Sequence, residues 1–261
     1  MNILQEIIDY KTNVEIPRLK KEIKKECIIE SSRNFKASLN SNNLALIAEI
    51  KYSSPSQFSK YNELKPIREN FNVNDCLFPY REHASAISVV TDNQFFGGYV
   101  DWLPHVQALT IHQKIPVLRK DFIINKLQID QSREYGADAI LLIASILTPK
   151  QIIQFYDKAK EYNMDCLVEV HSLDELKMVL NETPADIIGI NNRNLNTNKI
   201  DINNTLKLAE HIPDNIIKVS ESGFNTKNQI NKINNIVDGV LIGTSIIKSK
   251  DIERKINYLG F

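Results

Sequence analysis

Eight short apolar runs recur along this chain of 261 residues, and they restrict its fold more than any other feature. Amphipathic stretches separate them, and a repeat of about 30 residues is typical of parallel strands joined by crossover helices. We predict strands near residues 44–51, 86–91, 115–119, 138–143, 166–170, 186–190, 216–219 and 238–242. Eight such units in a chain of this length favour an α/β fold, a closed (β/α)8 TIM barrel, over an open doubly wound sheet.

The residues before this alternation are predicted to form an N-terminal helical extension. Apolar residues in 2–30 follow helical spacing, with Pro17 expected to separate two helical pieces. Residues 31–43 are polar and are expected to be a connector. We therefore expect a single domain over 1–261, with the extension and connector in 1–43 and the barrel in 44–261.

Composition excludes several classes of function. Lysines and arginines balance aspartates and glutamates at 32 each, so nothing in the net charge favours a nucleic-acid partner or an anionic membrane. The three cysteines and five histidines show no metal-ligand spacing, and no GxGxxG or P-loop occurs. We predict neither a metal nor a cofactor. The acidic start, MNILQEIIDYK, is unlike a signal peptide, so a cytoplasmic location is expected.

Several of the apolar runs end in charged or amide side chains. Residues two apart on a strand share a face, so these side chains point the same way as apolar residues lower on each strand. One such residue is more often a solvated strand end. Five strand ends together indicate a common pocket at the carboxyl-terminal face of the barrel. The residues concerned are Glu49, Lys51, Lys120, Glu169, Asn191, Arg193 and Glu221.

Two later segments suggest a phosphate site. Ser222-Gly223 follows the seventh predicted strand, and Gly243-Thr244-Ser245 follows the eighth. Barrels commonly bind a phosphoryl group there through backbone N–H donors. Either segment alone is equally well explained as an ordinary turn. Their joint placement favours phosphate binding, to which Ser54 after the first strand could add a hydroxyl.

Motifs in this order resemble those of the indole-3-glycerol-phosphate synthase family. They are LIAEIKYSSPS, ISVVTDNQFFGG, PVLRKDFIIN, GADAILLIASIL, CLVEVHSLDEL, IGINNRNL, VSESGF and VLIGTSI, and they cover residues 44 to about 250. The resemblance implies a carbon–carbon lyase of tryptophan biosynthesis. Such an enzyme closes 1-(2-carboxyphenylamino)-1-deoxyribulose 5-phosphate to indole-3-glycerol phosphate, with loss of carbon dioxide and water. A phosphosugar substrate and possible association with other tryptophan-pathway enzymes are also implied.

The same resemblance implies roles for individual residues. Lys120 would be the general acid that protonates the substrate ketone, and Glu169 its partner during dehydration. Lys51 would hold the carboxylate or the phosphate, and Glu49 would keep the lysines charged. The implied catalytic set is Lys120, Glu169, Glu49, Lys51, Asn191 and Glu221. The substrate-binding set is Ser54, Phe96, Phe122, Arg193, Leu195 and Ser222, and the phosphate-binding set is Lys51, Ser54, Gly223, Gly243 and Thr244.

The sequence departs from the family pattern after its first predicted strand, and two alternative functions remain open. Tyr52 stands where the family usually has a basic or small residue, and Gln57-Phe58 replaces a common glycine-bearing continuation. One alternative is a phosphoribosylanthranilate isomerase, although its Cys–Asp pair has no counterpart at the strand ends here. The other is a non-catalytic barrel that binds a partner enzyme. Such a barrel is expected to lose its charged strand ends, since burying them costs stability.

Overall fold

A computed structural model describes residues 3–23, 28–41, 43–54, 64–194, 197 and 199–261. Eight parallel strands form a closed barrel in the order β1 to β8. The strands are β1 (Ala45–Ile50), β2 (Ala86–Val90), β3 (Val117–Lys120), β4 (Ala139–Ile143), β5 (Asp165–Val170), β6 (Ile187–Asn191), β7 (Ile217–Glu221) and β8 (Gly239–Ile242). The barrel closes where Ala45 of β1 pairs with Gly239 of β8. The predicted TIM barrel is thus confirmed, and each predicted strand lies within two residues of an observed one at either end.

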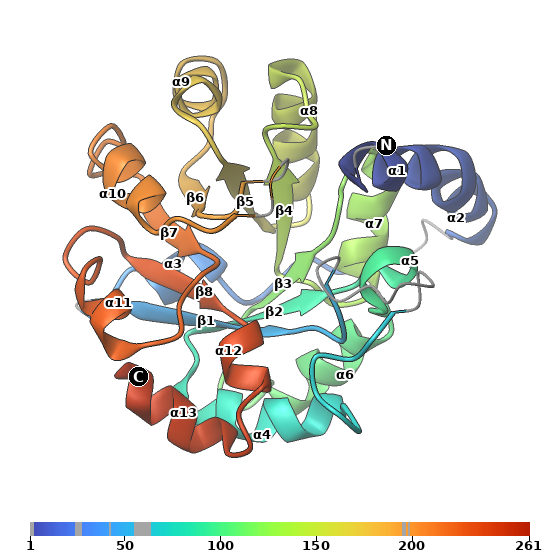
Figure 1. The fold of residues 1–261 in the computed structure, drawn as a ribbon. Helices are drawn as coiled ribbons and strands as arrows, with labels where there is room; N and C mark the ends of the chain where they lie inside the picture. Colours follow the sequence, from blue (N-terminus) through green and yellow to red (C-terminus); the bar gives the residue numbers. More distant parts are fainter. Residues whose placement is uncertain (1–2, 24–27, 42, 55–63, 195–196, 198) are drawn as a thin grey trace.

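Helices alternate with the strands around the outside of the barrel (Figure 1). They are α4 (Val73–His83), α5 (Asn93–Phe96), α6 (Trp102–Leu109), α7 (Lys126–Glu134), α8 (Pro149–Lys160), α9 (Leu173–Glu182), α10 (Asn203–Ala209), α11 (Lys227–Asn231), α12 (Thr244–Ile247) and α13 (Ile252–Leu259). Three of them begin with a capping box, in which the side chains of the N-cap residue and the glutamine three positions later each bond the other's backbone N–H. Local sequence therefore sets where α7, α8 and α11 start.

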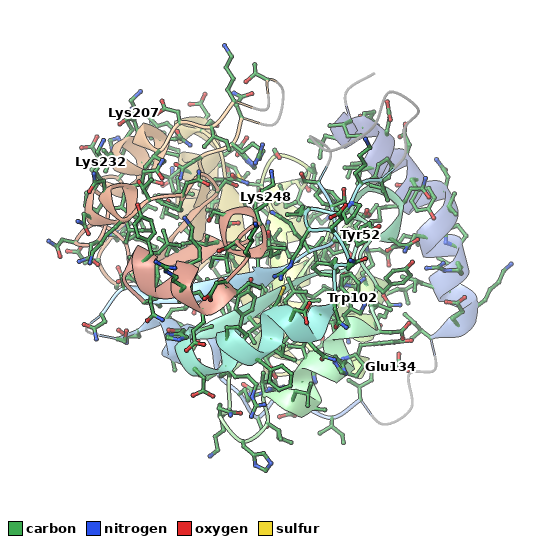
Figure 2. The ribbon with its side chains drawn as sticks, turned by 60° about the horizontal axis from the view of Figure 1, so that its bottom comes forward. Tyr52, Trp102, Glu134, Lys207, Lys232 and Lys248 are labelled. Atoms are coloured by element: carbon green, nitrogen blue, oxygen red, sulfur yellow. The ribbon has the colours of Figure 1, made fainter. Side chains whose placement is uncertain are left out.

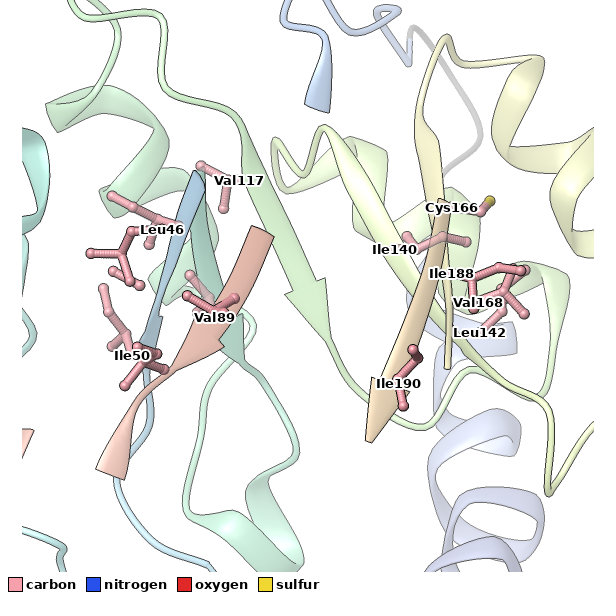
Figure 3. Packing of buried hydrophobic residues seen from close by; sticks show 14 of the residues in the cluster. Leu46, Ile50, Val89, Val117, Ile140, Leu142, Cys166, Val168, Ile188 and Ile190 are labelled. Carbon is pink, nitrogen blue, oxygen red and sulfur yellow. The ribbon is translucent and has the colours of Figure 1, made fainter. Parts of the chain in front are cut away.

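An outer apolar layer lies between the strands and the helices. Figure 3 shows side chains of this layer on β1 to β6, among them Leu46, Val89, Ile140, Val168 and Ile188. All five are fully buried or 1% exposed. Burying each such side chain contributes about 1.5–3 kcal/mol relative to leaving it in water. This layer attaches the helices to the barrel and leaves the inner face of each strand free for other side chains.

The inner face of the barrel is apolar in its lower half, the half towards the amino-terminal ends of the strands. Ile47, Leu118, Leu167 and Val219 belong to a second buried cluster, separate from the outer layer. The helix α3 (Phe35–Leu39) closes this end, with Phe35 and Leu39 fully buried in the same cluster. The prediction of a plain connector over 31–43 is therefore wrong in part. Polar neighbours mask the two apolar residues of α3 in the sequence, and Asn34 caps the helix through the Ala37 N–H.

The N-terminal extension is one helical run rather than two separate pieces. It consists of α1 (Ile3–Tyr10), the π-helical segment η1 (Lys11–Glu15) and α2 (Ile16–Glu22). Pro17 lies in the first turn of α2, directly after η1, and does not interrupt the run. Residues 28–30 are not helical, so the predicted helix ends too late. Figure 1 shows α1 and α2 beside α7. Within the residues placed by the structure, no helix has the length and apolarity to cross a membrane.

Candidate active site

A cavity of about 410 Å³ lies at the carboxyl-terminal ends of the strands. Its lining includes nearly all of the predicted site residues, which come from segments far apart in the chain. They are Glu49, Lys51, Ser54, Phe96, Lys120, Phe122, Glu169, Asn191, Arg193, Ser222, Gly223, Gly243 and Thr244. Glu221 is 1% exposed and lies behind this lining, and Leu195 falls outside the described residues. The predicted convergence on one pocket is confirmed.

Lys120, the last residue of β3, lies between two buried carboxylates. Its Nζ is 3.2 Å from Glu169 Oε2 and 3.4 Å from Glu221 Oε2. Burial by itself lowers the pKa of this lysine, but Glu169, Glu221 and Glu49 together raise the pKa well above its ordinary value. Lys120 is therefore protonated at neutral pH. Its side chain remains 19% exposed, so the ammonium can meet a ligand in the cavity.

Glu169 stays ionised although it is buried. Burial raises its pKa, but Lys120 and His171 together hold the pKa well below its usual range. His171 Nε2 lies 3.2 Å from Glu169 Oε1, and its Nδ1 lies 3.4 Å from Glu175 Oε2. Burial opposes the charge on this imidazole, yet the two glutamates raise the pKa of His171 to about 10. Sequence reasoning missed His171, although it lies only two residues after Glu169, directly beyond the end of β5.

Glu221 is the neutral member of the group. Burial raises its pKa to about 8; Lys120 opposes that shift and the charge of Glu169 adds to it. Lys120 thus contacts two carboxylates, of which only Glu169 is fully ionised at neutral pH. Space for Glu221 depends on Gly189, because a Cβ there would collide with Glu221 Oε1. The glycine inside β6 is therefore needed by the side chain of the neighbouring strand.

A second pair lies at the end of β1. Lys51 Nζ is 2.5 Å from Glu49 Oε1. Gly243, at the end of β8, faces this carboxylate, and a Cβ at that position would collide with Glu49 Oε1. Arg193 is half-buried; burial lowers its pKa and Glu49 opposes this shift. Glu49 therefore lies among cations at one edge of the cavity, beside the loop after β8.

The loops after β7 and β8 line one end of the cavity and are linked to each other. Ser222 and Gly223 both adopt positive φ, at 68° and 103°, which is uncommon for serine. Ser245 Oγ donates to the Phe224 carbonyl at 2.6 Å. Ser245, part of the predicted phosphate segment, also lines the cavity, as do Asn225 and Lys248, which were not predicted. In Figure 2, Lys248 lies nearer the middle of the molecule than Lys207 and Lys232, which lie on the outer side.

The opposite wall of the cavity is aromatic and apolar. Phe96 and Phe122 pack with ring centroids 5.9 Å apart, and Ile3, Leu4 and Ile7 of α1 complete the lining. The helical pattern of these three residues was visible in the sequence, but the pattern does not reveal what its apolar face contacts. Tyr52 packs edge-to-face on Phe71, with ring centroids 5.8 Å apart, and against Gly97. The other departure, Gln57-Phe58, lies outside the described residues.

The histidines, cysteines and carboxylates that the structure describes include no group of three or more able to hold a metal ion. The cavity instead offers a protonated lysine, ionised carboxylates, an aromatic wall and glycine-containing loops. A TIM barrel with these groups at its carboxyl-terminal face belongs to the class of enzymes that act on small phosphorylated substrates by acid–base chemistry.

Comparison with known proteins gives the particular family. The chain matches the model of the family "Indole-3-glycerol phosphate synthase" over residues 3–259, and it belongs to that family. The indole-3-glycerol phosphate synthase of Leptospira interrogans is 40% identical over 253 residues, covering 97% of this chain and 94% of its own. The reaction of the family is a decarboxylating carbon–carbon lyase step in tryptophan biosynthesis on a phosphosugar-type substrate.

Two further similarities extend the comparison. The "Tryptophan biosynthesis protein TrpCF" of Buchnera aphidicola is 40% identical over 229 residues, which are 88% of this chain and 47% of that protein. Among solved structures, thiamine phosphate pyrophosphorylase from Pyrococcus furiosus superposes with a TM-score of 0.59 at 16% identity, covering 84% of this chain and 94% of its own. That structural similarity concerns the fold alone.

Proposed function

We propose that the chain closes 1-(2-carboxyphenylamino)-1-deoxyribulose 5-phosphate to indole-3-glycerol phosphate with the cavity residues described above. The observation that carries the assignment of roles is the position of Lys120. It is a protonated, partly exposed lysine with Glu169 and Glu221 within 3.4 Å of its ammonium. A cation there can donate a proton to a bound ketone without a metal.

Ring closure comes first. The ring carbon that bears the carboxylate attacks the ketone carbon, and the Lys120 ammonium gives its proton to the ketone oxygen, which becomes a hydroxyl. The ring loses its aromaticity in this step. The carbon–carbon bond to the carboxylate then breaks, carbon dioxide leaves, and its electron pair restores the aromatic ring. Decarboxylation thus needs little help from the protein.

Dehydration completes the indole. The hydroxyl leaves as water after taking up a proton, and a base removes a proton from the neighbouring sugar carbon. Glu169 is the base in this proposal because it is ionised at the cavity wall while Glu221 is largely protonated. Lys51 is the second acid in reach of the substrate, and its ammonium pairs with Glu49 at 2.5 Å. Asn191 offers its amide to the sugar hydroxyls.

Substrate binding divides between the two ends of the cavity. The anthranilate ring is proposed to lie against Phe96 and Phe122, and Leu195 remains a prediction for the same wall. The phosphate is proposed to lie at Gly223, Gly243 and Thr244, with Ser54 and Lys51 nearby and Lys248 as an additional cation. Arg193 and Ser222 would hold the middle of the substrate. A flexible substrate held at both ends is brought into a reactive shape, an effect that can be large.

The proposal also covers the domain organisation, the location and the association of the protein. Extension and barrel form one domain in this proposal, because Ile7, Leu19, Phe35 and Leu39 are buried with the barrel. We place the protein in the cytoplasm. Association with another tryptophan-pathway enzyme is supported by the TrpCF relative, which continues well beyond the part matched here.

The test is product analysis with purified protein and no added metal or nucleotide. We expect indole fluorescence to appear in step with equimolar release of carbon dioxide. Conversion of a phosphoribosyl anthranilate substrate without carbon dioxide release would instead favour an isomerase. Binding of the carboxyphenylamino substrate without turnover would favour a non-catalytic barrel.

A further inference from the structure

A lysine of the N-terminal extension is completely buried behind the cavity wall. Lys11, the first residue of η1, is 0% exposed, which is rare for lysine. Its Nζ lies 2.7 Å from Asp121 Oδ1, 3.1 Å from Asp92 Oδ2 and 2.6 Å from Glu15 Oε2. One buried cation therefore compensates carboxylates from three separate segments.

Two of these carboxylates end neighbouring strands of the barrel. Asp92 follows β2, and its Oδ1 accepts the Phe95 N–H at 2.7 Å, which starts α5. Asp121 directly follows Lys120, and its Oδ1 accepts the Phe122 N–H at 2.8 Å. Both aspartates line the cavity. Lys11 thus joins the segments that carry Phe96, Lys120 and Phe122.

The extension contacts the same segments a second time. Glu15 Oε1 accepts a hydrogen bond from Gln128 Nε2 at 3.1 Å, and the same amide donates to the Phe122 carbonyl at 3.0 Å. Tyr10 packs edge-to-face on Phe95 with ring centroids 5.9 Å apart. The π-helical turn of η1 places Lys11 and Glu15 together, and such turns are frequent at functional sites.

We propose that Lys11 is a positioning residue for the reaction: by neutralising Asp92 and Asp121 it holds the aromatic wall and Lys120 in place. This inference rests on the proposed function. Arg119 pairs with Asp121 at 3.0 Å, whereas the ion pair of Asp92 among the described residues is the one with Lys11. Without Lys11, Asp92 becomes a buried carboxylate beside a second one, and it must take up a proton or move. Either change loosens the start of α5 and hence Phe96.

The experiment compares Lys11→Met with Lys20→Met, which removes an exposed lysine from the same extension. The measurements are kcat and KM for indole formation, inhibition by inorganic phosphate, and the melting temperature. We expect Lys11→Met to lower kcat/KM by at least about tenfold, as small misplacements near reacting groups do. Phosphate inhibition is expected to stay within about twofold, because Lys11 touches neither loop of the phosphate end. Lys20→Met is expected to match the wild type.

A second substitution provides a rescue and covers poor folding of Lys11→Met. Adding Asp92→Asn removes one of the buried carboxylates, so the double variant is expected to recover several-fold of the lost kcat/KM. If Lys11→Met does not fold, the double variant is compared with Asp92→Asn alone, and a drop in kcat/KM is again expected.

Two results would overturn the inference. One is an unchanged kcat/KM in folded Lys11→Met. The other is a parallel loss of kcat/KM and phosphate inhibition, which would show a general structural role. An inactive wild-type protein would be a different result, since it would contradict the proposed function itself.

Discussion

The lower and upper halves of the barrel interior are built on the same strands but hold opposite kinds of side chain. Ile47, Leu118 and Leu167 lie in the lower half, within the apolar cluster closed by α3. Glu49, Lys120 and Glu169 lie two residues further along the same strands and line the cavity. A step of two residues keeps a side chain on the same face, so only height along the barrel separates the two groups.

Because of this difference, we expect the lower half to contribute mainly to stability and the upper half to hold the catalytic groups. Apolar side chains in the lower half stabilise the barrel by about 1.5–3 kcal/mol each when fully buried. Buried charges in the upper half cost several kcal/mol per ion before pairing and hydrogen bonds offset the cost. Substitutions in the upper half should therefore alter catalysis, and those in the lower half should alter stability.

The largest expected effect is a loss of turnover caused by a substitution in the upper half. Lys120→Met removes the proposed proton donor, so we expect kcat to fall by about a thousandfold or more. KM is expected to change little, because other groups hold the substrate. The assay is indole fluorescence, with Lys150→Met at an exposed position of α8 as the control. Turnover within tenfold of the wild type would exclude Lys120 as the acid.

The next effect concerns the phosphate end. Gly243→Asp brings bulk and negative charge against Glu49 at the loop after β8. Losing charge-assisted contacts to a phosphate corresponds to about a 10- to 100-fold rise in KM. Steady-state kinetics measure this rise in KM. The control is Asn228→Asp on α11, which adds the same charge at an exposed position outside the cavity lining. Equal KM values for the two variants would place the phosphate elsewhere.

The lower half is tested at the end opposite to the cavity. Leu39→Ala removes a fully buried side chain from α3, so we expect the free energy of unfolding to fall by about 2–5 kcal/mol. Chemical denaturation measures this loss. The value of kcat, measured well below the melting temperature, is expected to stay within about twofold of the wild type if the two halves are independent. A large drop in kcat of the folded variant would contradict the separation.

The smallest effect is a pH dependence that originates in the upper half. Burial raises the pKa of Glu221 from 4.5 to about 8, so folding takes up a proton between these values. Its contribution to stability is therefore complete below the lower value and is lost as pH rises towards the higher one. Glutamine cannot ionise. We expect the melting temperature of Glu221→Gln, relative to the wild type, to rise by a few degrees between about pH 5 and about pH 8. A difference independent of pH would show that Glu221 is ionised in the folded protein.

Much of the site could be predicted because strands have a period of two. Leu167 and Glu169, or Val219 and Glu221, share a face in any extended strand, so their alignment follows from the sequence alone. Eight strand–helix units then imply where the strand ends meet. His171 follows Glu169 at the same spacing of two and could have been found with it. Lys248, by contrast, directly follows a short helix, α12, whose orientation no local pattern specifies.

The sequence by itself determined the strand order, the inward-facing residues and the chemical groups at the strand ends, because these depend on periodicity and on short connections. Tertiary structure alone decided that α3 closes the barrel, that α1 lines the cavity and that Lys11 lies against Asp92 and Asp121. It also decided that Glu169 is ionised while Glu221 is largely protonated. Apart from the contribution of His171 to Glu169, such properties arise from burial and from charges more than forty residues away in the chain, and no local pattern encodes those neighbours.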